Sequence, residues 1–422
     1  MSQDNLIPLK TPESESFGDA LSELVRQGAR QIIATAVEVE VKAFLSQYQD
    51  LKDDQGRQAI VRNGYLPERT ITTGIGALEV RLPKVRDRTG GGIKFNSSLL
   101  PPYLKRSRSV EELLPWLYLK GISTGDFSEA LTSLLGAKAT GLSANTISRL
   151  KAKWTEEHGQ WQHRSLRSKR YVYVWADSIY FNIRSGDRQC VLVLIGVSQT
   201  GHKELLGLEM GLRESQLNWK TLLLRLQDQG LVDAPDLAIG DGALGFWSAL
   251  SQVYPSTKVQ RCWVHKTANV LNYLPKSQPP QAKAGLQEIY NAATKATADV
   301  AFERFIKSYE AKYPKAVDCL SKDRQKLLAF YECPAEHWLH LRTTNPIEST
   351  FATVRLRTSK TRGCVSCASI LSLVFKLVQS AQKRWLRIRG FDHLGAVIDG
   401  VIFRDGVRTD PRSDLREHKD AA

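Results

Sequence analysis

The feature that most constrains the fold is a series of short apolar runs between residues 171 and 264. Five runs predict strands, at Tyr171–Ala176, Tyr180–Arg184, Cys190–Val197, Asp236–Gly240 and Thr257–Val264. Segments with apolar residues at helical spacing, Ser215–Gln229 and Ala243–Val253, separate the later runs. Three adjacent strands, followed by an alternation of helix and strand, indicate a mixed sheet with helices on its faces.

The rest of the chain carries mainly helical patterns. Apolar residues between Phe17 and Leu51 predict one or two amphipathic helices, which serve either core packing or dimerisation. Gln281–Trp338 predicts at least two helices and no convincing strand, which indicates an all-helical insertion. Long helices are predicted at Pro346–Thr361 and Ile370–Ile388. Thr70–Leu82 differs, because two β-type stretches around a glycine-rich turn predict a hairpin.

Three or four short helices are predicted between Val110 and Trp154. The segment Gly141–Ser143 leads into a polar helix that begins at Ala144. A short helix, a glycine-containing turn and an exposed helix form the layout of a DNA-binding helix-turn-helix. The candidate DNA contacts on the second helix are Asn145, Thr146, Ser148, Arg149 and Lys153. The same pattern is common in purely structural helical bundles, so both interpretations stay open.

The charge of the chain favours a polyanionic partner. Lys and Arg number 59, Asp and Glu number 44, and the net charge is +15. Nucleic acid is the commonest partner of such a protein, although general solubility would also explain the total. Residues 349–390 contain no acidic residue and nine basic ones: Arg355, Arg357, Lys360, Arg362, Lys376, Lys383, Arg384, Arg387 and Arg389. A second cluster, Arg164, Arg167, Lys169 and Arg170, also matches a surface that follows phosphates.

Composition excludes several classes of protein. No apolar run approaches the ~18 residues that a membrane span requires, so we expect no membrane partner. Residues 1–15 are polar and acidic and lack the layout of a signal peptide. Six cysteines at irregular spacing do not resemble a disulfide framework. We therefore expect a cytoplasmic protein with reduced thiols.

Three acidic residues stand at positions suited to catalysis. Asp177 lies at the carboxyl end of the first predicted strand, and Asp241 follows the strand that ends at Gly240. Ligands of open α/β sheets bind beyond the carboxyl ends of strands. Glu348 is in the first turn of a basic helix that Pro346 begins and that Asn345 is predicted to cap. Each position alone has a structural explanation, because carboxylates often cap or complement helix N-termini.

Three converging carboxylates suit phosphoryl transfer with two metal ions. Two Mg²⁺ ions about 3.5–4 Å apart can hold the attacking and the leaving oxygen of a phosphodiester. Mg²⁺ prefers carboxylate oxygens and usually takes only one or two from the protein beside water and phosphate. We therefore expect Asp177, Asp241 and Glu348 to be both the catalytic residues and the metal ligands.

The chain resembles the Mutator-type transposases of bacterial insertion sequences over roughly residues 17–390. In the first part of the chain the matching stretches are RNGYLPERTITTGIGALEVRLPKVRDR, SLLPPYLKRS, GIST and LSANTISRL. Later ones are VWADSIY, LIGV, LGL, IGDGALGF, QRCWVHKTANVL, TTNPIEST and TSKTRG. Two departures are mild: Ser178 replaces a smaller residue and Pro346 a frequent alanine, and neither change replaces one of the three acidic residues.

The resemblance implies a ribonuclease-H-like core that presents Asp, Asp and Glu, with an all-helical insertion before the Glu. By motif, these residues are Asp177, Asp241 and Glu348. The 107 residues from Asp241 to Glu348 leave room for that insertion. We divide the chain into a disordered tail (1–16), a helix and β-hairpin region (17–108), a helix-turn-helix region (109–165), the first part of the core (166–273), the helical insertion (274–342), the last part of the core with basic helices (343–390) and a C-terminal tail (391–422).

The motif Cys262-x-x-His265 also belongs to the family pattern. It is half of a zinc site, which Cys364 and Cys367 could complete, but no pattern brings the two halves together and we do not expect zinc. Otherwise Cys262 packs in the core, and His265 orients the site or contacts DNA. Trp338 is either a core residue or a platform for an exposed base.

The resemblance implies a DNA transposase that binds terminal inverted repeats and performs Mg²⁺-dependent strand cleavage and transfer. Mn²⁺ is expected to substitute for Mg²⁺, and no nucleotide cofactor is expected. The partners would be double-stranded element ends and target DNA, bound by at least a homodimer, in association with the bacterial nucleoid. Arg355, Arg357, Lys360 and Arg362 would contact the DNA backbone. Two alternatives are a nuclease or resolvase of the ribonuclease H class and a DNA-binding regulator without chemistry.

Overall fold

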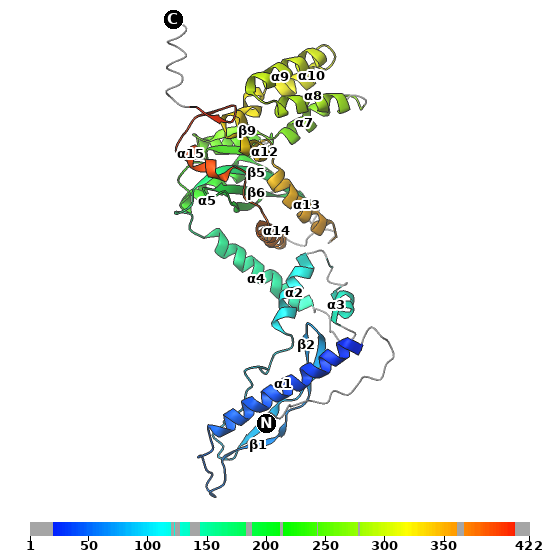
Figure 1. Ribbon diagram of the computed structural model, residues 1–422, viewed down its shortest axis with the longest axis vertical. Helices are drawn as coiled ribbons and strands as arrows, with labels where there is room; N and C mark the ends of the chain where they lie inside the picture. The colour runs from blue at the N-terminus through cyan, green and yellow to red at the C-terminus, as the bar shows by residue number, and fades with distance from the viewer. Residues whose placement is uncertain are drawn as a thin grey trace, which may run out of the picture. The chain divides into compact units, whose positions relative to one another are not determined.

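The computed structural model describes residues 20–119, 122, 127–135, 144–182, 188–211, 214–242, 244–276, 279–360 and 367–409. The chain forms two compact units, Met1–Leu150 and Lys151–Ala422 (Figure 1). None of the helices in the described ranges is long and apolar enough to cross a membrane.

The first unit combines a long helix with two small antiparallel sheets. Helix α1 (Ala20–Ser46) is a single helix and packs on the strands (Figure 1). The pairs are β1 (Ile60–Tyr65) with β4 (Pro83–Asp87) and β2 (Arg69–Thr73) with β3 (Gly76–Val80). The predicted hairpin is confirmed, because Thr73 pairs with Gly76 and leaves two residues for the turn. Gly76 has φ +108°, a conformation that favours glycine.

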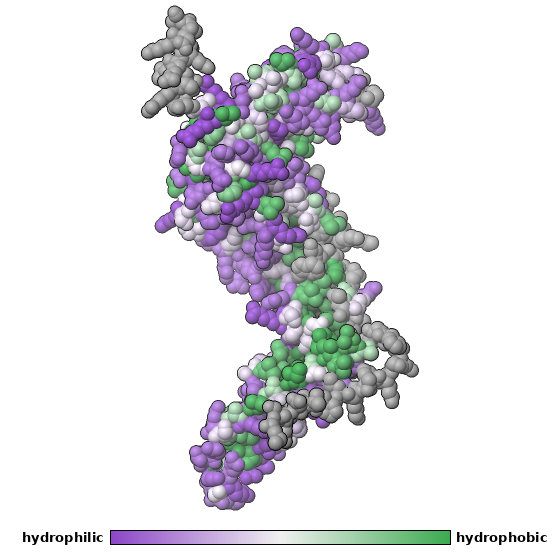
Figure 2. Space-filling model, viewed as in Figure 1, coloured by the Kyte–Doolittle hydropathy of each residue, from purple (hydrophilic) through white to green (hydrophobic). Residues whose placement is uncertain are grey.

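The first unit also exposes hydrophobic side chains on α1. Leu21, Val25, Ile32 and Val39 are exposed, whereas Val37 and Val41 are buried against the sheets. Figure 2 shows hydrophobic residues gathered where α1 begins, beside α3 and the β2–β3 hairpin. A buried face and an exposed apolar face on one helix agree with core packing, and leave dimerisation through α1 as a prediction.

Three helices follow: α2 (Arg108–Leu119), α3 (Phe127–Leu135) and α4 (Ala144–Gln162). The short helices predicted between Val110 and Trp154 are therefore confirmed, and the helix predicted to begin at Ala144 continues to Gln162. Residues 136–143, which would form the turn of a helix-turn-helix, lie outside the described residues. The helix-turn-helix thus stays a prediction.

The second unit contains a five-stranded mixed sheet in the order β7-β6-β5-β8-β9. Strands β5 (Tyr171–Asn182), β6 (Arg188–Ser198) and β7 (Lys203–Gly211) are antiparallel neighbours. Strands β8 (Leu237–Gly240) and β9 (Lys258–Arg261) run parallel to β5. The predicted mixed sheet is therefore confirmed.

Two predictions about the strands were wrong. Tyr171–Ala176 and Tyr180–Arg184 were expected as separate strands, but β5 continues through the polar residues Asp177 and Ser178, whose backbones pair with Val193 and Leu192. Strand β7 was not predicted, because Glu204, Gly207 and Glu209 interrupt its apolar pattern. Glu and Gly are depleted in strands, so the local pattern gave no signal.

Helices cover both faces of the sheet. On one face, α5 (Gln216–Asp228) and α6 (Leu244–Val253) bury Trp219, Leu222 and Phe246 against alternate residues of β5 and β6. On the other face lie α13 (Asn345–Lys360) and α14 (Cys367–Gln382), where the Trp175 indole donates to the carbonyl of His340. Because both faces are covered, most of β5 is buried, and the polar residues Asp177 and Ser178 stand out among its apolar neighbours.

The described residues between β9 and α13 contain helices and no strand, as predicted. The elements are α7 (Trp263–Leu271), α8 (Pro279–Asn291), α9 (Lys295–Tyr309), α10 (Pro314–Ser321), α11 (Arg324–Leu327), η1 (Ala329–Glu332), η2 (Ala335–His337) and α12 (Trp338–Leu341). Helix α7 begins at Trp263, so the last predicted strand ends earlier than expected and His265 is helical. Figure 1 shows α8, α9 and α10 projecting from the sheet.

Residues after 390, which we expected to form a tail, contain regular structure as far as Arg408. They form η3 (Phe391–His393), α15 (Leu394–Ile398), β10 (Phe403–Arg404) and β11 (Val407–Arg408). Leu394 and Phe403 are buried, and this burial attaches the segment to the unit.

Candidate active site

Asp177 and Asp241 come from neighbouring parallel strands. Ala176 on β5 pairs with Gly240 on β8, so each aspartate follows one member of that pair. Strand β8 ends at Gly240, which puts Asp241 at the carboxyl end of the strand, as predicted. Asp177 is not at the end of its strand, because β5 extends to Asn182. Strand β8 thus stops beside the middle of β5, and the two aspartates lie next to each other at this point.

Glu348 comes from the first turn of α13. The helix begins with hydrogen bonds from the backbone N–H groups of Ile347 and Glu348 to the carbonyl of Thr344. Thr344 is therefore the N-cap residue, and the prediction that Asn345 has this role was wrong. Pro346 occupies the first turn, where its missing N–H has no consequence. The Thr344 hydroxyl donates a 3.1 Å hydrogen bond to Oε1 of Glu348.

The negative charges of Asp241 and Glu348 act on Asp177. Asp177 is only 9% exposed, and burial, together with these two charges, raises its pKa to about 7, although His265 and the backbone N–H of Ser178 oppose the rise. A buried carboxylate beside two others is a site of uncompensated negative charge. This donor set fits hard divalent cations, which favour carboxylate oxygens.

His265 is the cationic neighbour of this cluster. Its Nε2 lies 3.7 Å from Oε1 of Glu348. The adjoining Cys262 side chain, with Asp177 and Asp241, raises the pKa of His265 to about 9 although burial opposes the rise. The imidazole is therefore protonated at neutral pH in the metal-free protein and offsets part of the negative charge. From the sequence, His265 was expected either to orient the site or to contact DNA. In the structure it lies beside the carboxylates, as the first alternative requires.

Cys262 is fully buried, which confirms its predicted place in the core. Burial alone would raise its pKa, but His265 and Thr344 outweigh that effect and the pKa is lowered. Cys367 is exposed and Cys364 lies outside the described residues, so the structure gives no support to the four-residue zinc site. Ligand atoms of Cys262, His265 and Glu348 nevertheless lie within 4.8 Å of one another.

The sequence analysis missed a fourth acidic residue, Glu214. Its Oε2 accepts a 2.8 Å hydrogen bond from Ser178, and its Oε1 accepts a 3.0 Å bond from the Trp219 indole. Burial, together with the charge of Asp241, raises the pKa of Glu214. The one signal in the sequence was Ser178, which departs from the family pattern directly after Asp177.

The candidate DNA contacts are only partly described. Ser148, Arg149 and Lys153 are exposed on α4, and Arg355 is exposed on α13 with its guanidinium near the Phe351 ring. The side chains of Asn145, Thr146, Arg357 and Lys360, and all of Arg362, lie outside the described residues. These assignments therefore stay predictions.

Trp338 is a core residue, which is one of the two interpretations that the sequence allowed. It is 8% exposed, and its indole donates a 2.9 Å hydrogen bond to the carbonyl of Cys333. The rings of Phe330 and Tyr331 pack against it edge-on. These contacts occupy the faces that a base would need.

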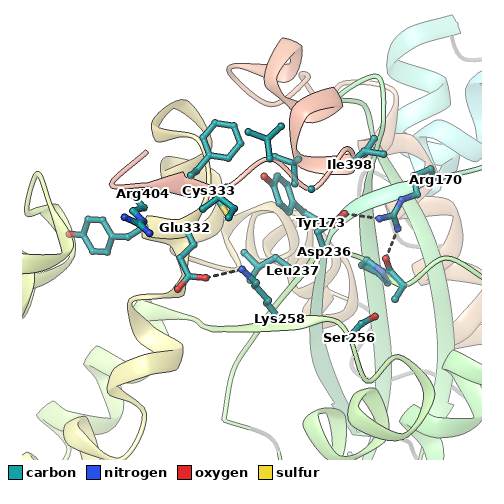
Figure 3. A pocket seen from close by; sticks show the side chains of 18 of the residues that line it. Arg170, Tyr173, Asp236, Leu237, Ser256, Lys258, Glu332, Cys333, Ile398 and Arg404 are labelled. Carbon is teal, nitrogen blue, oxygen red and sulfur yellow. Dashed lines mark hydrogen bonds and ion pairs between the residues drawn. The ribbon is translucent and has the colours of Figure 1, made fainter. Parts of the chain in front are cut away.

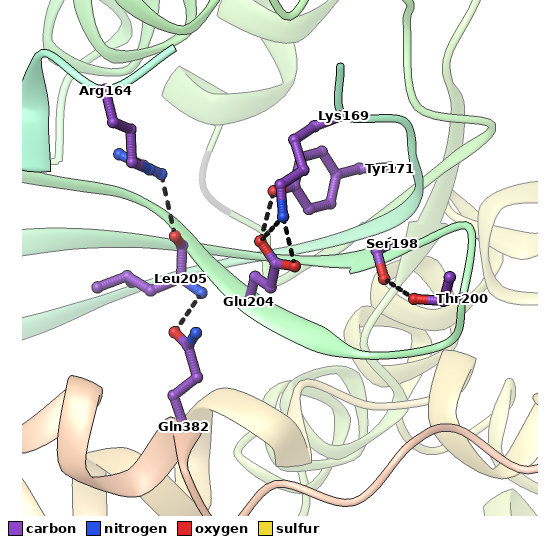
Figure 4. A network of polar contacts seen from close by, with 8 residues as sticks. All are labelled: Arg164, Lys169, Tyr171, Ser198, Thr200, Glu204, Leu205 and Gln382. Carbon is purple, nitrogen blue, oxygen red and sulfur yellow. Dashed lines mark hydrogen bonds and ion pairs between the residues drawn. The ribbon is translucent and has the colours of Figure 1, made fainter. Parts of the chain in front are cut away.

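The basic cluster at residues 164–170 does not form a phosphate-binding surface as expected. Arg164 donates to the carbonyls of Leu205 and Leu206, and Lys169 pairs with Glu204 (Figure 4). Arg170 pairs with Asp236. Three of the four cations therefore have partners within the protein. Strand β7 supplies those of Arg164 and Lys169, and the sequence did not reveal this strand.

A cavity of 1210 Å³ lies at the other end of the sheet, near the first residues of β5, β8 and β9 (Figure 3). Its charged groups are largely paired, as in Arg170 with Asp236 and Lys258 with Glu332. Residues 397–405 form part of its wall. The cavity is thus separate from the strand ends that carry the carboxylates.

The fold and the site together define an α/β protein with a carboxylate centre beside the end of a parallel strand. The family model described as "Transposase, Mutator family" matches residues 2–388, and the chain belongs to this family. It is 53% identical over 280 residues to the transposase for insertion sequence element IST2 of Acidithiobacillus ferrooxidans, covering 66% of this chain and 95% of that protein. It is 48% identical over 307 residues to the transposase for element IS6120 of Mycolicibacterium smegmatis, covering 72% and 94%. A transposase for element ISRM5 of Rhizobium meliloti is 27% identical over 401 residues, covering 94% of this chain and 93% of that protein.

Proposed function

We propose that the protein is a DNA transposase of an insertion sequence, with a catalytic site of two aspartates and a glutamate on a ribonuclease-H-like core. The observation that carries the proposal is the position of Asp177 and Asp241 directly after paired residues of two neighbouring strands, with Glu348 close enough that its charge acts on Asp177. Membership of the Mutator family and the names of the relatives support the same function. The mixed sheet, with Asp177 on its central strand and Asp241 on the next, is compatible with this core.

Asp177, Asp241 and Glu348 would hold two Mg²⁺ ions, which Mn²⁺ could replace. Bound there, the ions would polarise phosphate oxygens and lower the pKa of the attacking hydroxyl group or water. The carboxylates fit this role because they come from separate elements of the fold, Asp177 and Asp241 from neighbouring strands and Glu348 from the first turn of α13. Before metal binds, the positive charge of protonated His265 would reduce the repulsion between the carboxylates.

The remaining parts of the chain would bind DNA. Basic residues on α13, beginning with Arg355, follow the catalytic glutamate and would fix the phosphate backbone in register. The exposed residues of α4 would contact bases of the terminal inverted repeats. Cleavage and joining of two element ends requires two catalytic sites, so we expect a homodimer or larger assembly on paired ends.

A nicking assay on a duplex that contains an element end tests this function. The wild-type protein should nick the duplex only with Mg²⁺ or Mn²⁺. Asp177→Asn, Asp241→Asn and Glu348→Gln should each reduce nicking by at least about 10³-fold, since charge stabilisation at a single group contributes 10²–10³-fold or more. All three variants should retain DNA binding in a gel shift. The control is Asp228→Asn, which changes an exposed carboxylate at the end of α5.

Unchanged nicking in any of the three variants would show that the substituted residue is not catalytic. Nicking by wild-type protein in the presence of a chelator would rule out a metal-dependent mechanism altogether. A wild-type protein that binds element ends and never cuts them would instead favour the DNA-binding regulator.

A further inference from the structure

The two elements that carry Asp241 and Glu348 are far apart in the chain. The separation is 107 residues, and the helical insertion fills most of it. Catalytic groups must be held within about 0.5 Å of their working positions, so something must fix α13 against β8. The described contacts between Gly240 and Glu348 contain a continuous route that meets this need.

The route passes through two side chains that are both 0% exposed, Cys262 and Thr344. The backbone N–H of Cys262 donates a 2.8 Å bond to the carbonyl of Gly240, the residue before Asp241. The backbone N–H of Thr344 donates to the Cys262 sulfur at 3.3 Å. The sulfur also lies 3.4 Å from Oγ1 of Thr344, and this hydroxyl donates to Oε1 of Glu348.

The direction of each hydrogen bond between Cys262, Thr344 and Glu348 follows from which groups can donate. Because the Thr344 hydroxyl gives its only hydrogen to Glu348, it can act only as acceptor towards the Cys262 thiol. The thiol therefore donates to the hydroxyl, and the hydroxyl donates to the carboxylate. Bonds in such a chain polarise one another, which strengthens the last one. That last bond fixes which way the carboxylate of Glu348 faces.

The backbone next to this pair reinforces it. The N–H of Trp263 donates a 2.9 Å bond to the carbonyl of Arg342, so residues 262–263 and 342–344 lie side by side. Thr344 is also the N-cap of α13. The side chain of an N-cap residue usually accepts a hydrogen bond from a backbone N–H of the first turn. The described bonds of the Thr344 hydroxyl run instead to Cys262 and to the carboxylate of Glu348.

We propose that Cys262 and Thr344 are positioning residues that orient the Glu348 carboxylate relative to Asp241 for binding of the divalent ions. This proposal rests on the proposed function. In this role both residues act through Glu348 and are not themselves ligands of the ions, although the Cys262 sulfur lies within 4.8 Å of ligand atoms of His265 and Glu348. Removing the hydroxyl leaves Glu348 with the His265 contact at 3.7 Å as its remaining described partner, and its carboxylate can then rotate.

The test compares two threonines on the same helix. Thr344→Val removes the hydroxyl at nearly constant volume, and Thr344→Ser retains it. The matched control is Thr350→Val, because Thr350 is also buried on α13 and its hydroxyl bonds only to the carbonyl of Pro346 among the described contacts. Mn²⁺ binding to the full-length protein is measured by calorimetry without DNA, and nicking is measured at a series of Mg²⁺ concentrations.

Thr344→Val should weaken Mn²⁺ binding about 10-fold or more, the usual effect of losing a partner of a metal ligand. The Mg²⁺ concentration for half-maximal nicking should rise by a similar factor, with DNA affinity unchanged. Thr344→Ser and Thr350→Val should bind Mn²⁺ as wild type does. Equal Mn²⁺ affinity in Thr344→Val and wild type overturns the proposal, whereas absent Mn²⁺ binding in wild type overturns the proposed function instead.

Thermal melts separate poor folding from poor positioning. If Thr344→Val melts at a far lower temperature than Thr350→Val, Mn²⁺ binding is measured with Cys262→Ala instead. This variant keeps the Thr344 hydroxyl and removes the thiol that bonds to it. Weaker Mn²⁺ binding in a folded Cys262→Ala protein supports the proposal, and wild-type binding overturns it.

Discussion

Replacing Asp177 with asparagine should stabilise the metal-free protein at neutral and alkaline pH. The carboxylate is 9% exposed, and its pKa is raised from 3.8 to about 7, first by burial and then by neighbouring acids. A raised pKa means that folding favours the protonated form. The penalty for the ionised form is therefore small below about pH 4, grows between pH 4 and pH 7, and is constant above.

The size of the effect follows from the pKa. At 1.36 kcal/mol for each pKa unit, a rise from 3.8 to about 7 corresponds to about 4 kcal/mol. This figure already includes the favourable charge of His265, which opposes the rise. Asparagine removes the penalty, but burial of its amide without matched partners costs about 1–3 kcal/mol. We therefore expect a net gain of about 2 kcal/mol at pH 8, or roughly 4–8 °C in melting temperature for a unit of this size.

Thermal and urea denaturation in the presence of a chelator, at pH 5 and pH 8, measure this gain. The advantage of Asp177→Asn over wild type should be clearly larger at pH 8 than at pH 5. Mg²⁺ should stabilise wild type and should stabilise the variant much less, because binding to the folded state is lost. The exposed control Asp228→Asn should stay within about 0.5 kcal/mol of wild type. An equal gain at both pH values, or a loss at pH 8, would refute the reasoning.

Three further substitutions test the packing. Gly245→Ala should cost about 1–3 kcal/mol in urea denaturation, because the new Cβ would lie 2.8 Å from the backbone nitrogen of Gln216; an unchanged midpoint would contradict this contact. Trp338→Ala should cost about 3–5 kcal/mol, whereas normal stability with weaker binding to single-stranded DNA would restore the base-stacking role. Lys266→Met should cost about 3 kcal/mol, because the fully buried ammonium pairs with Asp323; a more stable variant would show that burial of this charge is unfavourable overall.

The sequence was most informative about the elements whose burial leaves a strong pattern. Strands β6 and β8 are buried on both faces, so their residues are apolar without interruption, and both were predicted. Strand β7 was missed because Glu204 and Glu209 find partners only in the fold, in Lys169 and Arg225. A local pattern does not contain such partners.

At the candidate site too, features set by neighbouring residues were predicted and features set by distant contacts were not. The position of Asp241 was predicted correctly, because the end of strand β8 can be recognised from neighbouring residues in the sequence. The cap of α13 was assigned to the wrong residue, since Thr343, Thr344 and Asn345 are all good N-caps and the hydrogen bonds alone decide between them. Glu214 was missed because Ser178 and Trp219, which hold it, are distant or unremarkable in sequence.

Trp263, at the start of the helix that leads into the insertion, bonds to Arg342 at the end of the insertion. A segment whose two ends are neighbours can change in length without displacing the structure on either side. We therefore expect that the insertion can differ between relatives without displacing Asp241 or Glu348. A chimera that exchanges residues 274–341 with those of a relative, and keeps His265 and the bonded ends, should still bring the three carboxylates together.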